Sequence, residues 1–226
     1  MLKYFSIIMK KLAIFDLDGT LLNTVEDLGD ATNYALRMCG GFPEYKTGDY
    51  YMMVGNGIYK LFERALPEEK RTKEMVAKMA SFFLPYYDAH MCDKTVPYPG
   101  INEMIHEISS AGVKVALASN KYQAGCEKLI RHFFSDIPFV KVCGQREGFP
   151  LKPDPKLVEG IMEVAGTERK DVVYSGDSGV DMQTGANAKV DTVGVMWGFR
   201  SREELEKFSP WRIASSPIEL KDWILE

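Results

Sequence analysis

Short apolar runs alternate with helical patterns over most of the chain after residue 95, and one more run lies near its start. The runs are KLAIF at 11–15, VKVALAS at 113–119, FVKVC at 139–143, DVVYSGD at 171–177 and DTVGVMW at 191–197. Continuous apolar runs of this length are typical of strands buried on both faces. Because helical patterns separate the later runs, they predict βαβ units and a parallel sheet with right-handed crossovers.

Residues 24–95, between the first two runs, show helical spacing and no strand alternation. Thr24 is expected to be the N-cap of the first helix, with Asp27 completing a capping box. The glycines at 40 and 41 should end that helix, because glycine favours the left-handed conformation found there. A second helix should follow Gly55, and a third should run from about residue 72 until Pro85 ends or kinks it.

These patterns predict an α/β fold with two parts. Residues 1–23 and 96–226 should form a Rossmann-like core around the parallel sheet. Residues 24–95 should form an all-helical cap inserted after the first core strand. Such a cap would lie above the carboxyl edge of the sheet, where open α/β sheets bind their ligands.

Composition narrows the classes of protein. Of the 226 residues, 46% are hydrophobic and 27% are charged, as in ordinary globular chains. The formal net charge of −4 argues against a nucleic-acid or anionic-membrane partner, since both favour a basic surface. No apolar run reaches the roughly 20 residues of a membrane-spanning helix. The composition is that of a soluble globular chain, and its oligomeric state is left open.

The cysteines indicate where the protein works. Cys39, Cys92, Cys126 and Cys143 are far apart and form no C-x-x-C pair. A chain with this much core needs no disulfide framework, so we expect a reducing cytoplasm. The N-terminal sequence MLKYFSIIMKK lacks the apolar length and cleavage site of a signal peptide, and either Met1 or Met9 is a credible start.

Polar side chains gather where the predicted strands end. They are Asp16 and Asp18 in FDLDGT, Ser119 and Asn120 in LASN, Lys152 in LKPDP, and Asp177 and Asp181 in YSGDSGVD. The carboxyl ends of parallel strands face one crevice, so these side chains should converge. Several carboxylates in one crevice repel each other, and a hard cation with oxygen ligands, Mg²⁺, relieves that repulsion.

This set of residue types suits phosphoryl transfer. Lys152 supplies a fixed positive charge, Ser119 a hydroxyl, and the N–H groups around Asn120 are expected to open a helix that attracts an anion. An aspartate can attack a phosphoryl group to give an aspartyl-phosphate. A second aspartate can protonate the leaving alkoxide and then activate water.

The four motifs, in this order, resemble those of the haloacid dehalogenase-like phosphohydrolase superfamily. The resemblance covers nearly the whole chain and implies that Asp16 is the nucleophile and Asp18 the general acid and base. It implies that Ser119, Asn120 and Lys152 hold the phosphate. It assigns the Mg²⁺ ligands to Asp16, the Asp18 backbone carbonyl and Asp177, with Asp181 in support.

The helical insert is similar to that of the phosphoglycolate phosphatase branch of this superfamily. The segments MVGNGIYKLFERAL, VPYPGI and MWGFRSREEL carry that likeness. It implies that phosphoglycolate is the first substrate to consider and that Asn56, in the loop at 55–57, meets the substrate. Arg64 is placed on a solvated helix face and receives no role.

Simpler interpretations stand beside these. Gly55-Asn56-Gly57 is also typical of a plain turn, Ser119 and Asn120 of helix caps, and Asp181 of a cap on the following helix. Other functions are also open on the same scaffold: a pyrophosphatase, a nucleotidase, a phosphosugar mutase, or a catalytically idle binding protein. The intact carboxylates and Lys152 argue against the idle protein.

Overall fold

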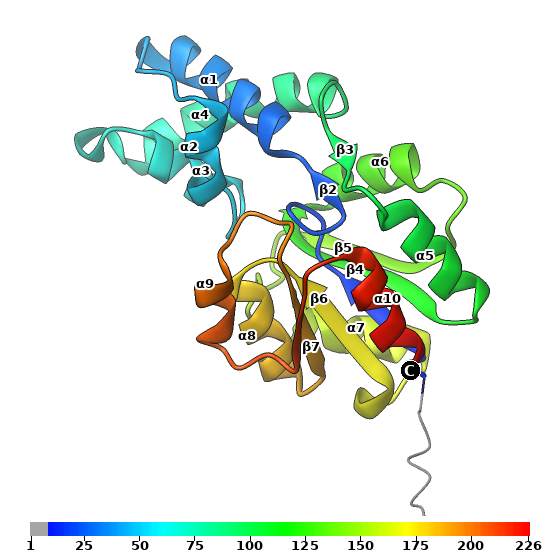
Figure 1. The fold of residues 1–226 in the computed structure, drawn as a ribbon. Coiled ribbons are helices and arrows are strands. Elements are labelled where there is room, and N and C mark those ends of the chain that lie inside the picture. Colours follow the sequence, from blue (N-terminus) through cyan, green and yellow to red (C-terminus); the bar gives the residue numbers. More distant parts are fainter. Residues whose placement is uncertain (1–8) are drawn as a thin grey trace, which may run out of the picture.

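A six-stranded parallel sheet forms the centre of the computed structural model, which describes residues 9–226. Its strand order is β5-β4-β1-β6-β7-β8 (Figure 1). The strands are β1 (Leu12–Phe15), β4 (Lys114–Tyr122), β5 (Phe139–Gln145), β6 (Val172–Gly176), β7 (Asp191–Val195) and β8 (Arg212–Ala214). The predicted Rossmann-like α/β fold is confirmed, and only the short edge strand β8 was not predicted.

The strand order places a crevice beside β1. From β1 the chain builds outward through β4 and β5, then returns to add β6, β7 and β8 on the other side. The order therefore reverses between β1 and β6, which are paired in register from Leu12 with Val172 to Phe15 with Ser175. In open α/β sheets, ligands bind at the carboxyl ends of the strands at such a reversal.

Helices cover both faces of the sheet. They are α5 (Ile101–Ser110), α6 (Gln123–Phe133), α7 (Lys156–Ala165), α8 (Gly179–Ala188), α9 (Arg202–Glu206) and α10 (Pro217–Leu225), with a 3₁₀ turn at Arg169–Asp171. Ala13 and Phe15 pack into the core on the side of α5, α6 and α10, whereas Leu12 and Ile14 pack against α7. This alternation explains why the whole of β1 is apolar.

Four helices stand beyond the carboxyl edge of the sheet (Figure 1). They are α1 (Val25–Gly40), α2 (Thr47–Met53), α3 (Ile58–Ala65) and α4 (Lys73–His90), with a 3₁₀ turn at Glu68–Lys70. The chain enters this group through β2 (Leu22–Asn23) and leaves it through β3 (Val96–Pro97), which pair antiparallel. Both connections to the core thus lie side by side. We keep residues 24 and 95 as the proposed limits of the cap.

Three local predictions are corrected in part. Thr24 is the N-cap residue of α1, as predicted, but its side chain makes no capping hydrogen bond, because its hydroxyl donates to Asp18 Oδ1 at 2.7 Å. Asp27 completes no capping box, since its carboxylate accepts hydrogen bonds from the backbone N–H groups of Lys94 and Thr95. Of the two effects predicted for Pro85, ending the helix is wrong, because α4 continues to His90 with Pro85 inside it, whereas a kink stays a prediction. The buried Phe83 and Tyr87 of α4 stack on each other across that position and favour the continuous helix.

Residues 1–8 lie outside the described residues, so the choice between Met1 and Met9 as the start is not addressed by the structure. Over residues 9–226, none of the helices combines the length and the apolar character required to cross a membrane.

Candidate active site

The end of β1 carries the first two predicted aspartates. Asp16 continues the strand, and its N–H donates to the Ser175 carbonyl on β6 at 2.9 Å. The chain then turns sharply at Gly19, whose φ is 85°. A Cβ at Gly19 would lie 2.3 Å from Asp177 Oδ2, so only glycine lets the β1 loop pass this close to the β6 loop. This close approach brings the two acidic motifs together.

The end of β6 carries the other two aspartates. Ser178 is the N-cap of α8 and forms a capping box with Asp181, whose Oδ2 accepts from the Ser178 N–H and hydroxyl. The second oxygen, Oδ1, accepts from Lys152 Nζ at 2.7 Å and from the Tyr174 hydroxyl at 2.8 Å. Asp181 therefore caps the helix with one oxygen and holds Lys152 and Tyr174 with the other.

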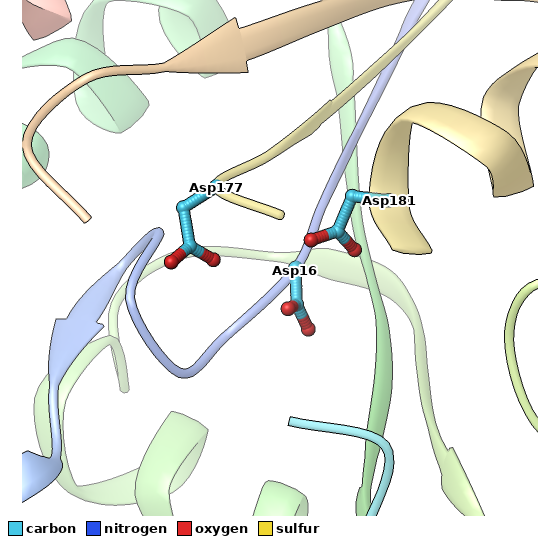
Figure 2. Close-up of side chains that lie close together, drawn as sticks. All are labelled: Asp16, Asp177 and Asp181. Carbon is cyan, nitrogen blue, oxygen red and sulfur yellow. The ribbon is translucent and has the colours of Figure 1, made fainter. Parts of the chain in front are cut away.

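Three carboxylates converge at this point, as Figure 2 shows for Asp16, Asp177 and Asp181. Each offers one oxygen, and these oxygens all lie within 4.8 Å of one another. All three residues are buried. Three buried carboxylate oxygens this close are a ligand set for a hard divalent cation. The site therefore fits a metal ion.

Electrostatics support the same conclusion. Burial raises the pKa of Asp16 to about 6, because its effect is larger than the lowering effect of the nearby Lys152 ammonium. The negative charges of Asp181 and Asp18 raise this pKa further. Burial, and then the charges of Asp181 and Asp16, raise the pKa of Asp177 well above its usual value. A bound cation would favour the ionised forms of both groups.

Lys152 is the buried cation of the site. Its Nζ lies 2.9 Å from Asp16 Oδ1 and donates to Asp181 Oδ1 and to the Tyr174 hydroxyl. Burial alone would lower the pKa of Lys152, but the charges of Asp16 and Asp181 raise it well above the ordinary value. Lys152 is therefore a permanent positive charge beside the Asp16 carboxylate.

Ser119 and Asn120 also reach the crevice, but the expected helix does not begin there. Strand β4 continues to Tyr122, and α6 starts at Gln123, so the N–H groups around Asn120 are not those of a helix N-terminus. The Asn120 amide instead holds the backbone of Lys152. Asn120 Oδ1 accepts from the Lys152 N–H at 2.8 Å, and Nδ2 donates to the Lys152 carbonyl at 3.2 Å.

The sequence analysis missed Lys121. Its buried Nζ donates to both oxygens of Asp18, at 2.9 and 3.1 Å, and lies over the Tyr87 ring of α4. A usable signal was the two-residue spacing from Ser119, which in a strand puts both side chains on one face. Because a helix was expected to begin near Asn120, the shared strand face of Ser119 and Lys121 was not recognised.

The segment after β7, residues 196–201, was singled out for its family likeness, but no site residue was predicted in it. The Phe199 N–H donates to Asp177 Oδ2 at 2.7 Å. Arg200 donates from Nη1 to the Tyr51 carbonyl and from Nη2 to the Val54 carbonyl at 2.7 Å, at the C-terminal end of α2. This one segment therefore contacts both the aspartate cluster and the cap.

A cavity of about 300 Å³ lies between the cap helices and the sheet edge. All the predicted site residues line it except Asp181, which is fully buried behind it. Asn56 lines it from the cap, with a φ of 63°, as does Arg64, whose expected solvated position is wrong. Arg64 is half-buried, and it donates to the carbonyls of Met53 and Gly55.

Comparisons with known proteins show which proteins this chain resembles in sequence and in fold. A phosphoglycolate phosphatase from Psychrobacter arcticus is 32% identical over 96% of each chain, and one from Vibrio vulnificus is 32% identical over 95% of this chain and 96% of its own. A crystal structure of a Lactobacillus delbrueckii subsp. bulgaricus protein matches with a TM-score of 0.88 at 32% identity, covering 96% of this chain and 99% of that one. The family model for haloacid dehalogenase-like hydrolases matches residues 13–195. The chain belongs to the haloacid dehalogenase-like hydrolase family.

Proposed function

We propose that this protein is a Mg²⁺-dependent phosphatase that hydrolyses a small organic phosphate monoester through an aspartyl-phosphate on Asp16. The observation that carries the proposal is the position of Asp16, which lies 2.9 Å from Lys152 Nζ and within 4.8 Å of two further carboxylates. A nucleophile, a fixed cation and a cation site thus share one crevice. Relatives over 30% identical along nearly the whole chain are phosphoglycolate phosphatases, so phosphoglycolate is the substrate we propose.

In the first half of the reaction, a carboxylate oxygen of Asp16 attacks phosphorus, and the bond from phosphorus to the ester oxygen breaks. Asp18, which takes up a proton from solvent as the substrate binds, gives that proton to the leaving oxygen, so the alcohol departs neutral. In the second half, Asp18 takes a proton from water as the water oxygen attacks the phosphorus of the aspartyl-phosphate. Inorganic phosphate leaves and Asp16 is restored as a carboxylate.

The other residues hold the reacting groups. We propose that Lys152 and the Ser119 hydroxyl bind the phosphoryl oxygens, with Asn120 either binding them too or fixing the backbone of Lys152. Asn56 would meet the substrate from the cap. Asp16, the Asp18 carbonyl and Asp177 would hold Mg²⁺, with Asp181 positioned behind them. When bound, the ion would neutralise charge on the phosphoryl oxygens and on the aspartates.

We also propose a cellular compartment and a partner for the enzyme. All four cysteines fall within the described residues, and all four are unpaired, which suits a reducing cytoplasm. The only partner we propose is a small phosphorylated metabolite. A cavity of about 300 Å³ favours such a substrate over a polymer.

The test is phosphate release from a panel of substrates, measured with Mg²⁺ and with EDTA. The panel holds phosphoglycolate, hexose phosphates, nucleoside monophosphates and pyrophosphate. We expect Mg²⁺-dependent turnover with the highest kcat/KM for phosphoglycolate. A higher kcat/KM for pyrophosphate or for a nucleotide would identify a different substrate and would leave the proposed reaction chemistry in place. No turnover of any substrate by folded, Mg²⁺-loaded protein would overturn the proposal.

A further inference from the structure

Arg64 is a positive charge in the cavity that no carboxylate neutralises. Its acidic neighbour Glu63 pairs with Lys60 at 2.6 Å, and Glu204 lies 3.6 Å from Arg200. Among residues 9–226, no carboxylate oxygen lies within 4.0 Å of the Arg64 guanidinium. Burial, and then the charge of Arg200, lower the pKa of Arg64. A half-buried guanidinium beside a second one is unfavourable unless an anion joins them.

Backbone contacts fix the guanidinium without saturating it. Nη1 donates to the Met53 carbonyl at 2.7 Å and to the Gly55 carbonyl at 3.2 Å. Nη2 makes one long contact, 3.5 Å, with Asn56 Oδ1. Within the described chain, Nε donates to no acceptor. A guanidinium has five donor hydrogens, so donors remain for a ligand.

The cap loop that holds Arg64 lies directly against the predicted phosphate site. A Cβ added at Gly57 would be 3.7 Å from the Asn120 carbonyl oxygen, and one at Gly55 would be 3.5 Å from Arg200 Nη2. Arg64 lines the same cavity as Asp16 and Asp177. The aspartates and Lys152 occupy its core side, and Arg64 occupies its cap side.

We infer that Arg64 binds a carboxylate at the end of the substrate remote from the transferred phosphoryl group, and so selects acidic phosphate monoesters. The inference rests on the proposed phosphatase function and deepens it. Arginine suits this task because its planar fork matches the two oxygens of a carboxylate. The inference also gives a ligand to Arg64, the one cationic side chain lining the cavity that has no carboxylate partner among the described residues.

The test compares two substrates of nearly equal size: phosphoglycolate and 2-hydroxyethyl phosphate, in which a neutral alcohol replaces the carboxylate. We expect the wild type to prefer phosphoglycolate in kcat/KM by about tenfold or more, the usual effect of a hydrogen bond between charged groups. Arg64→Gln should abolish most of that preference, and Arg64→Lys should keep part of it. Lys60→Ala, an exposed position on the same helix, should keep all of it.

The substrate pair separates recognition from a structural role. If Arg64 merely orders the cap loop, Arg64→Gln lowers kcat/KM for both substrates by one common factor, and that result overturns the inference. An unchanged preference overturns it too. Calorimetric binding of phosphoglycolate to Asp16→Asn, with and without Arg64→Gln, gives a readout that needs no turnover. Weaker binding in the double variant supports the inference even if the panel test overturns the proposed reaction, and equal binding contradicts it.

Discussion

Lys121 and Asp18 form a buried ion pair in which one ammonium group contacts both carboxylate oxygens, at 2.9 and 3.1 Å. The side chains are 2% and 16% exposed, so solvent screens the pair little. The Thr24 hydroxyl donates to the same carboxylate, at 2.7 Å. The proposed acid and base is thus held in one orientation by a strand residue from the core and by the residue that precedes α1.

The ion pair should contribute to stability as well as to catalysis. Lys121→Met leaves the Asp18 carboxylate partly buried without its cation, and losing one partner of a buried pair costs about 3–5 kcal/mol. Lys121→Met combined with Asp18→Asn should cost less than the sum of the two single changes. Denaturant unfolding of the four proteins measures this coupling. Strictly additive losses would show that the pair contributes no net interaction.

Asp18→Asn should slow both halves of the reaction, because asparagine can neither protonate the leaving oxygen nor take a proton from water. With p-nitrophenyl phosphate, whose leaving group departs without a proton, the aspartyl-phosphate on Asp16 should accumulate or decay slowly. We expect kcat to fall by about 10²- to 10⁴-fold, the usual contribution of general acid–base catalysis. Acid quenching followed by peptide mass analysis should locate a phosphoryl group on Asp16. A variant with wild-type kcat would remove Asp18 from this role.

Arg200 should hold the cap against the core. It donates two hydrogen bonds to carbonyls at the end of α2, and its neighbour Phe199 binds Asp177. Arg200→Ala should speed hydrogen exchange in residues 47–57 and raise KM for phosphoglycolate by about tenfold, since each such bond to a charged group is worth about 1.5–3 kcal/mol. Arg202→Ala, at an exposed position two residues away, is the matched control. Unchanged exchange in Arg200→Ala would contradict this role.

The raised pKa of Asp16 makes stability depend on pH in the metal-free protein. Its pKa is about 6 in the folded chain against 3.8 as the ordinary value, so the folded state binds this proton more tightly. The resulting stabilisation is fully present below about pH 4 and is lost as pH rises through about 6. Asp16→Asn carries no such group. In EDTA, the free energy of unfolding of Asp16→Asn minus that of the wild type should rise by on the order of 3 kcal/mol between pH 4 and pH 7. A pH-independent difference would show that the folded environment leaves this pKa unchanged.

The sequence predicts the sheet and the positions of the acidic motifs well, because both depend on local pattern. The apolar run of β1 and the carboxylates that follow it can be recognised from the sequence without any tertiary information. Helix α2 was not predicted because Tyr50 is its only buried residue, so it has no apolar stripe to detect. Strand β8 has three residues, too few for a pattern.

The missed site residues depend on contacts between distant segments. Arg200 reaches carbonyls about 150 positions away, and Arg64 was expected in solvent because a charged side chain on a helix usually lies there. Asp181 shows the opposite case. One oxygen belongs to the capping box, the simpler of its two interpretations, and the other accepts from Lys152, while the side chain stays fully buried behind the cavity.

The central claim is that Asp16 attacks the phosphorus of a small phosphate ester beside a divalent cation. Phosphate release from phosphoglycolate by the wild type and by Asp16→Asn, each with Mg²⁺ and with EDTA, tests it most directly. Circular dichroism would establish that the variant is folded. We predict turnover only by the wild type with Mg²⁺, and none above background in the other three reactions. Turnover by folded Asp16→Asn, or full activity of the wild type in EDTA, would contradict the account.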